Sequence, residues 1–320
     1  MEKLIIYHTD IDPKTATPDD LDVLEEAKFV SEILSKMSYE PILRSFNIER
    51  AREEIKRISP VFVFNLVEAI NGKESLSYLA PEVFEQEGVP YTGCTKSAFV
   101  KTANKISAKN ILNENGITTP YFLTLGDLSK EELQGRKFLL KSATDHASRG
   151  LEATLYQDKD SVERALKSRG IDFFAEEYIE GREFNISIIG LISKGIVLPI
   201  AEMQFKDWKE GKLKIVDYDA KWNPNAHEYS ATVRNFDFLE EDQNLIKNLE
   251  SICKSCWNLF DLRGYARVDF RVSEQGIPYV LEINSNPCIS PDAGFIAAVE
   301  KAGMTREQII RKIIKYSCNI

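Results

Sequence analysis

The 320-residue sequence lacks several features that mark common protein classes. It has no run of about 18 apolar residues, so we expect no membrane span. The apolar segment at residues 1–7 is too short for a signal peptide and is soon followed by polar residues. The 41 basic and 50 acidic residues give a net charge of −9. This charge argues against a general partner of nucleic acids or anionic membranes.

Cysteine and histidine are also scarce, with five cysteine and three histidine residues. This odd, low number of cysteines is typical of a protein from the reducing cytoplasm. The single C-x-x-C pair, Cys253 and Cys256, lies in residues 239–260, where apolar residues recur at helical spacing. No second Cys or His pair completes a zinc site. We therefore predict that both cysteines pack in the core, with metal or redox chemistry as the alternative.

The N-terminal third alternates strand-like and helix-like segments. Strands are predicted at 3–7, 41–44 and 60–67, and helices at 19–38, 47–58 and 75–87. This order predicts an open parallel sheet of Rossmann-like type. The sequence has no G-x-G-x-x-G, so we predict no dinucleotide site there. Functional residues are expected beyond the strand ends, at 8–12 and 68–75.

The middle of the chain predicts a helix over 97–115, ended by Gly116, and strands at 137–141, 151–156 and 172–179. Lys101, Lys105 and Lys109 share one stripe of this helix, and we expect two of them to be ordinary solvated lysines. The polar loop 142–150 follows Lys141, which is plausible for a phosphate lid, with an ordinary hairpin tip as the alternative. Further strands are predicted at 183–191 and 195–200 and helices at 239–260 and 292–302. A last helix begins at a capping box of Thr305 and Gln308.

The most informative stretch is 267–284, where polar and apolar residues alternate on both sides of a turn at 273–276. This pattern predicts a β-hairpin in which position 269 faces 280 and 267 faces 282. One face then carries four functional side chains: Arg267, Asp269, Glu282 and Asn284. Two carboxylates and a carboxamide suit Mg²⁺ that also holds phosphate oxygens. A solvent-exposed hairpin with a surface pair between Arg267 and Glu282 is the alternative.

Five motifs in order resemble the ATP-grasp superfamily, specifically its D-alanine–D-alanine ligase-like branch, over nearly the whole chain. They are Asn104-Lys105, Lys141 before SATDHASRG, Glu176–Ile179 followed by Glu183, Tyr218–Trp222, and the RVDF…LEINSNP stretch that starts at Arg267. The resemblance implies an α/β ATP-grasp fold. It would comprise an N-terminal Rossmann-like parallel-sheet domain (1–96), a central lid domain (97–178) and a C-terminal antiparallel-sheet domain (179–320).

The resemblance also implies the role of each site residue. Lys105 and Lys141 resemble the lysines that hold the nucleotide phosphates, and Ser148 lies in the loop that closes over them. Adenine is read by the backbone of a linker made of four residues: Glu176, Glu177, Tyr178 and Ile179. Glu183 resembles the ribose-hydroxyl acceptor, and Lys221 the lysine that closes over the γ-phosphate. Asp269, Glu282 and Asn284 match the ligands of two Mg²⁺ ions, for which Mn²⁺ is an alternative. Arg267 matches the catalytic arginine that stabilises the tetrahedral intermediate.

The implied chemistry is phosphorylation of a carboxylate by ATP, followed by attack of an amine on the acyl phosphate. The sequence departs from the family at the alanine-binding positions, with Ala147 and Trp222 in place of a Ser and a Tyr. Ala293-Gly294 replaces a Ser-Leu pair, and Cys288 replaces a Gly and is expected to be passive in the pocket. We therefore predict a ligase for small amino or carboxylic acids other than D-alanine. The alternatives are a D-alanine–D-alanine ligase, a small-molecule kinase or a non-catalytic nucleotide-binding protein. The resemblance also makes a homodimer reasonable.

Overall fold

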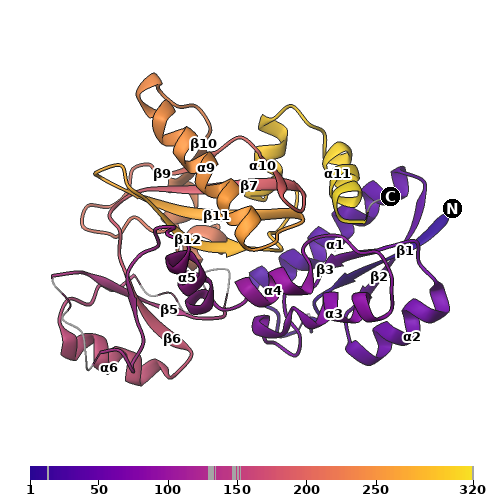
Figure 1. Cartoon of the computed structure of the whole chain (residues 1–320), viewed down its shortest axis with the longest axis horizontal. Coiled ribbons are helices and arrows are strands. Elements are labelled where there is room, and N and C mark those ends of the chain that lie inside the picture. The colour runs from indigo at the N-terminus through magenta and orange to yellow at the C-terminus, as the bar shows by residue number, and fades with distance from the viewer. Residues whose placement is uncertain are drawn as a thin grey trace.

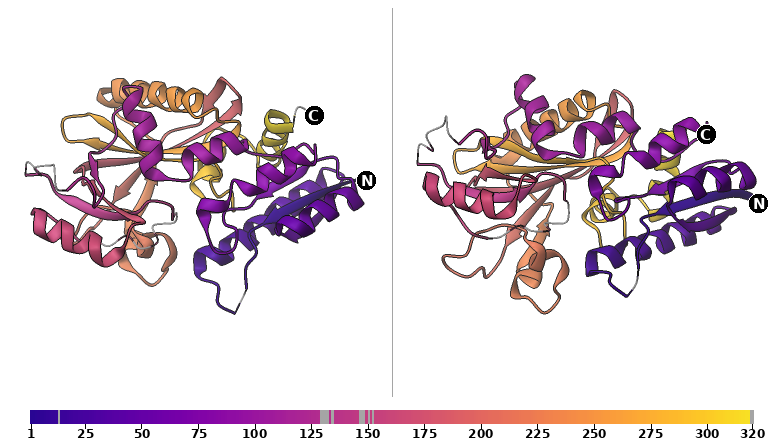
Figure 2. Two further views of the ribbon diagram at one scale, coloured as in Figure 1. Left: turned by 60° about the horizontal axis from the view of Figure 1, so that its bottom comes forward. Right: turned by 90° about the horizontal axis from the view of Figure 1, so that it is seen from below.

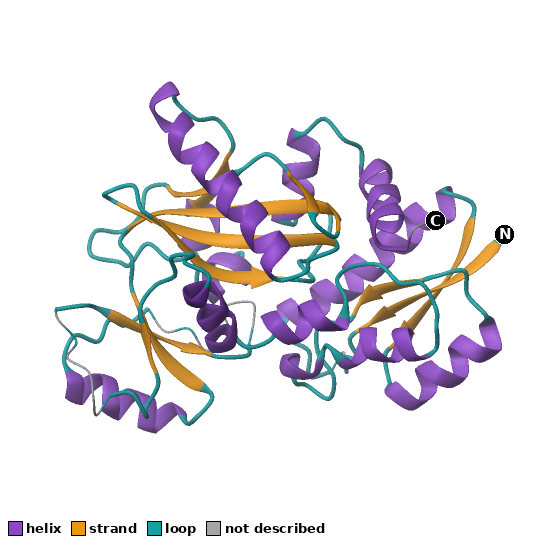
Figure 3. Cartoon of the chain, in the orientation of Figure 1, coloured by secondary structure: helices purple, strands orange, loops and turns teal. Residues whose placement is uncertain are grey.

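The structure is a computed structural model, which describes residues 1–12, 14–128, 133, 135–145, 149, 151 and 153–318. These residues form three β-sheets with helices packed against them (Figures 1 and 3). Each sheet falls inside one of the three predicted domains, while the domain boundaries themselves stay a prediction. No helix of the described residues is long and apolar enough to cross a membrane.

The N-terminal sheet is parallel, as predicted, with strand order β2-β1-β3. Its elements are β1 (Glu2–His8), α1 (Pro18–Lys36), β2 (Tyr39–Ser45), α2 (Ile48–Ile58), β3 (Val63–Leu66), η1 (Glu74–Leu76) and α3 (Leu79–Gln86). The two predicted functional segments meet beyond the strand ends. There, the Thr9 hydroxyl accepts the backbone N–H groups of Glu68 and Ala69 at 2.9 and 3.2 Å.

The predicted helix over 97–115 is two helices, α4 (Lys96–Thr102) and α5 (Lys105–Glu114). The break occurs because Asn104 adopts an extended backbone conformation and caps α5, its side chain accepting the Ser107 N–H at 3.0 Å. Gly116 follows α5 with a positive φ of 70°, as expected for the residue after a helix end.

The central sheet is antiparallel, with order β4-β6-β5. Its elements are β4 (Phe122–Leu123), β5 (Phe138–Ser142), α6 (Lys159–Arg169) and β6 (Phe173–Glu177). The strand predicted at 151–156 is wrong, because its described residues form only one bridge, between Tyr156 and Phe138. In Figure 2 this sheet and α6 lie at the end of the molecule opposite the N-terminal sheet.

The largest sheet is antiparallel, with order β10-β9-β7-β11-β12 and β8 paired to β7. Its elements are β7 (Gly181–Leu191), β8 (Lys194–Val197), β9 (Ala201–Phe205), α7 (Tyr218–Trp222), α8 (His227–Ala231), β10 (Thr232–Asn235), η2 (Glu240–Asp242), α9 (Gln243–Leu259), β11 (Gly264–Ser273) and β12 (Pro278–Asn284). Cys253 and Cys256 of α9 are fully buried in the core that this helix and α5 form with the sheet. Their predicted packing role is therefore confirmed.

The predicted register of the hairpin is wrong. Phe270 pairs with Val280, and a β-bulge then leaves Leu281 without a partner on β11, so that Asp269 pairs with Glu282 and Arg267 with Asn284. The bulge inserts one residue into β12, which the alternation of residue types does not reveal. It nevertheless places all four predicted side chains as two directly opposed pairs.

Two C-terminal helices, α10 (Gly294–Lys301) and α11 (Arg306–Cys318), join the N-terminal sheet to the largest sheet. Thr305 and Gln308 exchange the two hydrogen bonds of the predicted capping box, at 2.8 and 3.2 Å. Close packing at the start of β11 requires Gly264, which has φ +76° and no room for a side chain beside the Ser317 hydroxyl. These contacts hold the N-terminal sheet against the rest of the molecule.

Candidate active site

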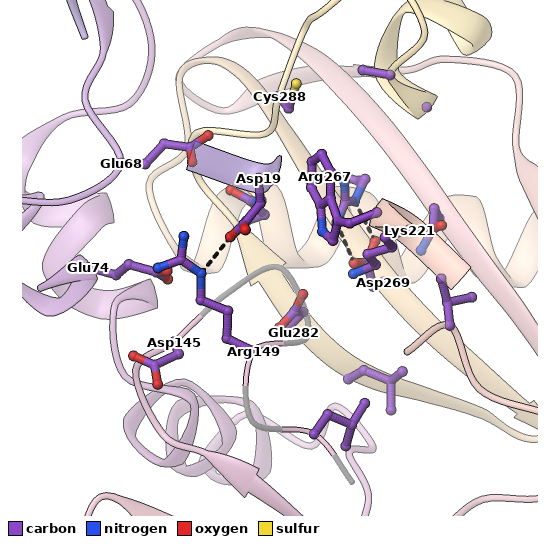
Figure 4. Close-up of a pocket in the computed structure, with 18 of the residues that line it drawn as sticks. Asp19, Glu68, Glu74, Asp145, Arg149, Lys221, Arg267, Asp269, Glu282 and Cys288 are labelled. Atoms are coloured by element: carbon purple, nitrogen blue, oxygen red, sulfur yellow. Dashed lines mark hydrogen bonds and ion pairs between the residues drawn. The ribbon is translucent and has the colours of Figure 1, made fainter. Parts of the chain in front are cut away.

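One cavity of about 640 Å³ lies between the three sheets (Figure 4). The described residues among the predicted site residues all line it: Lys105, Lys141, Glu176, Glu177, Tyr178, Ile179, Glu183, Lys221, Arg267, Asp269, Glu282 and Asn284. Ser148 and Ala147 lie outside the described residues. Both predicted functional segments of the N-terminal sheet also contribute, through Thr9, Ile11, Glu68, Ala69 and Glu74.

The hairpin forms one wall of the cavity. Arg267 donates two hydrogen bonds of 2.8 Å to Asp269, from Nε to Oδ1 and from Nη2 to Oδ2. On the next strand, Glu282 lies 3.7 Å from the Lys105 ammonium. A surface pair between Arg267 and Glu282 is therefore wrong, since Arg267 pairs with Asp269 inside the cavity. Burial acts against the charge of Arg267, but Asp269 raises its pKa above the ordinary value.

The donor set of this wall fits a divalent cation. Among the described residues, no group of three His, Cys, Asp or Glu side chains is arranged to hold a metal. Asp269 and Glu282 supply two carboxylates, and the third oxygen is the carboxamide of Asn284, which accepts the Asn286 N–H at 2.9 Å. Mg²⁺ characteristically takes one or two carboxylates and completes its shell with water and phosphate. The wall therefore fits a cation that is held jointly with a nucleotide.

A buried network of charged residues forms another part of the cavity lining. Glu176 forms ion pairs with the ammonium groups of both Lys109, at 2.6 Å, and Lys141. Lys109 also donates to the Thr119 hydroxyl at 2.8 Å. Burial acts to raise the pKa of Glu176, but the two lysines hold it below the ordinary value. Lys105, at the start of α5, donates to the backbone carbonyl of Asp145. Two of these lysines, Lys105 and Lys141, face the cavity as cations available to phosphate oxygens.

The linker after β6 is tied to the protein through part of its backbone. The Glu177 N–H donates to Tyr121 at 2.8 Å and the Tyr178 N–H to Lys137 at 2.7 Å. Glu176 and Glu177 are paired in the sheet with β4 and β5, whereas the Ile179 N–H has no backbone partner among the described residues. The linker therefore fits the predicted adenine site, which stays a prediction.

Glu183 lies at the other end of this region, 3.7 Å from the Arg271 guanidinium. Arg271 also stands over the Tyr178 ring at 5.3 Å and donates to the Gly181 carbonyl at 3.2 Å. Burial raises the pKa of Glu183 above its ordinary value. A hydroxyl donor would satisfy this carboxylate, which agrees with the predicted ribose contact.

The segment predicted as a loop around Lys221 contains the short helix α7, begun by Asp217, whose side chain accepts the Ala220 N–H at 2.9 Å. Burial and the nearby Arg267 lower the pKa of Lys221. The indole N–H of Trp222 is buried and has no hydrogen-bond partner among the described residues. Both side chains line the cavity, so α7 presents two donors to a ligand.

Side chains from the other two sheet regions reach Asp19 at the start of α1, and Figure 4 shows one of them, Arg149. The Asp19 carboxylate accepts hydrogen bonds from Arg149 at 2.5 Å and from the Tyr218 hydroxyl at 2.8 Å. Arg149 also pairs with Asp20 at 2.5 Å. Burial acts to raise the pKa of Asp19, but hydrogen bonds from Thr17, Arg149 and Tyr218 lower it. This cluster closes the cavity on the side of the N-terminal sheet.

Cys288 lines the cavity as a protonated thiol. Its sulfur lies 2.9 Å from Asp22 Oδ2 and 2.6 Å from the Ser290 hydroxyl. Burial and the carboxylates of Glu26 and Asp22 raise its pKa well above the ordinary value. A thiol held in this form is a poor nucleophile, which agrees with the passive role expected from the sequence.

Sequence reasoning missed several residues of the site. Lys109 is buried rather than solvated, and the only available signal was its position four residues after Lys105 on a helix face that also carries apolar residues. Arg271 alternates with Arg267 and Asp269, so the strand period placed it on their face of the hairpin. The partners of Arg149 on α1 lie about 130 positions away, and no local pattern could pair them.

Comparisons with known proteins agree with this architecture. A family model described as "D-ala D-ala ligase C-terminus" matches residues 133–315, more than half of the chain. A D-alanine–D-alanine ligase from Methylacidiphilum infernorum is 28% identical over 299 residues, 92% of this chain and 90% of that protein. The uncharacterized protein y4sG from Sinorhizobium fredii is 28% identical over 258 residues, 79% of this chain and 73% of that protein.

Solved structures show the same fold. The D-alanine–D-alanine ligase from Bacillus anthracis complexed with ATP aligns with a TM-score of 0.73 at 22% identity, covering 100% of this chain and 98% of that one. The VanG D-Ala:D-Ser ligase from Enterococcus faecalis aligns with a TM-score of 0.71 at 16% identity, covering 98% of each chain. The fold and site thus define an ATP-grasp ligase of the type that forms C–N bonds. The chain belongs to the D-alanine–D-alanine ligase C-terminal family.

Proposed function

We propose that the protein uses ATP to join the carboxylate of one amino acid to the amine of another, and that its substrates are not two D-alanines. The first part rests on one observation, that a single cavity is lined by the ammonium groups of Lys105 and Lys141 together with three hairpin side chains, those of Arg267, Asp269 and Glu282. Phosphoryl transfer to a bound acid requires cations that neutralise the phosphate oxygens, and it requires carboxylates that can hold a divalent cation beside them. Related ligases of the family support the reaction type.

In the first step, a carboxylate oxygen of the donor acid attacks the γ-phosphorus of ATP, and the bond to ADP breaks. Lys105, Lys141 and Lys221 neutralise the phosphate oxygens. Because these side chains are already in place in the cavity, they do not have to reorganise as negative charge moves during the transfer. A divalent cation bound at Asp269, Glu282 and Asn284 would supply further charge neutralisation on the phosphates. The product of this step is an acyl phosphate.

In the second step, the amine attacks the acyl carbon, loses a proton, and phosphate departs with the former carboxylate oxygen. Arg267 projects from the hairpin into the cavity and would stabilise the negative oxygen of the tetrahedral intermediate. The acyl phosphate must be shielded from water for this step to succeed. Contacts of Arg149 and Tyr218 with Asp19 would close the cavity on one side. Two bound ions, Mn²⁺ use and a homodimer stay predictions.

The substrate proposal rests on cavity residues that depart from the alanine-binding pattern of the resemblance. Trp222 contributes a buried indole N–H, and Ala293-Gly294 supplies neither a hydroxyl nor a large apolar side chain. The second candidate function is synthesis of D-alanyl-D-alanine itself. Several relatives bear the name D-alanine–D-alanine ligase, and this favours that candidate.

An assay with the purified protein, ATP and Mg²⁺ separates the candidates. D- and L-amino acids and hydroxy acids are supplied singly and in pairs, while ADP release and product mass are followed. We expect an amide-linked product from a pair other than two D-alanines. D-alanyl-D-alanine as the preferred product would establish the second candidate. A stable phosphorylated acid would indicate a kinase, and no turnover with any pair would overturn the ligase proposal.

Matched lysine variants test whether the cavity performs the reaction. Lys141→Met removes a cavity ammonium group, whereas Lys137→Met changes an exposed lysine near the start of the same strand. We expect the first to reduce turnover by about 100-fold or more and the second to leave it unchanged. Equal activities of the two variants would contradict the phosphate-binding role of Lys141.

A further inference from the structure

Arg234 of β10 lines the same cavity as Arg267 but differs from it in its partners. Arg267 is neutralised by two hydrogen bonds to Asp269. The Arg234 Nη1 donates at 3.1 Å to the backbone carbonyl of Asp292. Within the described part of the chain, no carboxylate forms an ion pair with Arg234. Arg234 therefore lines the cavity without an ion-pair partner there, although the Asp292 carboxylate is near enough to act on its pKa.

The guanidinium of Arg234 lies against Gly294, the first residue of α10. A Cβ atom at position 294 would lie 3.4 Å from Arg234 Nε and 3.9 Å from both Cζ and Nη2. The guanidinium thus occupies the space that a longer side chain at 294 would need.

Electrostatics around Arg234 favour an anionic ligand. Burial and the like charge of Arg267 lower the pKa of Arg234 below the ordinary value for arginine, and the opposing effect of the Asp292 carboxylate does not cancel them. Two guanidinium groups that face one cavity repel each other. An anion bound in the cavity near both groups would offset that repulsion. Arginine binds carboxylates through two parallel N–H donors, so a carboxylate matches this group in shape as well as in charge.

We propose that Arg234 binds the carboxylate of the amine-bearing substrate. This inference rests on the proposed function, in which two amino acids are joined. The donor's carboxylate is consumed at the lysines and Arg267, so it cannot also pair with Arg234. The carboxylate that survives the reaction belongs to the amine-bearing substrate, and it requires a cation of its own. The enzyme therefore selects amino acids over their amides or simple amines at the second position.

The test compares an amino acid with its own amide as the attacking amine, in Arg234→Ala, Arg234→Lys and wild-type protein. We expect Arg234→Ala to raise KM for the amino acid by about 10- to 100-fold, with KM for ATP unchanged. Preference for the acid over the amide should fall by the same factor, and Arg234→Lys should restore part of it. Arg311→Ala, which changes an exposed arginine on α11, is the control and should alter neither value.

A binding measurement keeps this test separate from the proposed function. The same acid and amide are titrated calorimetrically into protein saturated with Mg²⁺ and a non-hydrolysable ATP analogue. Weaker binding of the acid to Arg234→Ala, with the amide unaffected, supports the inference even where no ligation is seen. Equal binding of acid and amide to the wild type, or binding of neither, overturns it. Ligation without any such preference would overturn the inference while leaving the ligase proposal standing.

Discussion

The buried network at Glu176 allows a quantitative test of what holds this part of the cavity lining together. Lys109 is 1% exposed and Glu176 is 3% exposed, and their charged atoms lie 2.6 Å apart. Lys109→Met keeps most of the side-chain volume but leaves Glu176 with Lys141 alone. Removing one partner of a buried ion pair costs about 3–5 kcal/mol. Because Lys141 still neutralises Glu176, we expect the lower figure, a loss of about 3 kcal/mol in the free energy of unfolding.

The control for this variant is Lys101→Met. Lys101 lies on the neighbouring helix α4 and pairs at 2.5 Å with Asp261, whose side chain is 52% exposed. An exposed ion pair contributes only about 0–1 kcal/mol, so Lys101→Met should change the free energy of unfolding very little. Urea unfolding followed by tryptophan fluorescence measures both variants. If Lys109→Met loses no more stability than Lys101→Met, the network does not hold this part of the cavity lining together and the reasoning is refuted.

Three further predictions follow from single positions. Burial, then the charges of nearby carboxylates, raises the pKa of Glu68 to about 8. The folded protein then holds a proton that the unfolded chain releases, so stability falls as pH rises from about 5 to about 8. Glu68→Gln should make this decline smaller in melting temperatures recorded across that range, and an unchanged decline would contradict the prediction. Gly264→Ala brings a Cβ within 2.3 Å of the Ser317 hydroxyl, whereas Gly276→Ala has a similar φ but open space. Measured by urea unfolding, Gly264→Ala should lower the free energy of unfolding by about 1–3 kcal/mol more than Gly276→Ala does. Equal losses in the two variants would count against close packing at Gly264. Asp269→Asn or Glu282→Gln should lower turnover by about 100-fold or more with an unchanged circular dichroism spectrum, and near-normal activity would sink the metal assignment.

The parts of the fold that the sequence predicts well are those with strong local periodicity. The buried strand at 60–67, the amphipathic helix around Cys253 and the alternating hairpin all follow from residue spacing. The hairpin face was also correct, but its register was not. A single inserted residue, Leu281, shifts the pairing, and both strands keep their alternating pattern on either side of it.

The parts that could not be predicted depend on distant contacts. A lysine stripe on α5 looks the same whether it faces solvent or a buried glutamate, and only the packing of β6 beneath the helix decides it. Asp19, Arg149 and Tyr218 come together from three separate regions of the chain. Short strands such as β10 carry too few residues to show a period. Position 234 therefore gave no signal, although its side chain lines the cavity.

The central claim is that the cavity activates a carboxylate by transferring phosphate to it from ATP. The most direct test supplies a donor amino acid whose two carboxylate oxygens carry a heavy isotope. The account predicts that the released phosphate contains one heavy oxygen and the amide product retains the other, because the carboxylate oxygen attacks the γ-phosphorus and leaves with it. Phosphate without the heavy isotope, alongside formation of the amide product, would contradict the account.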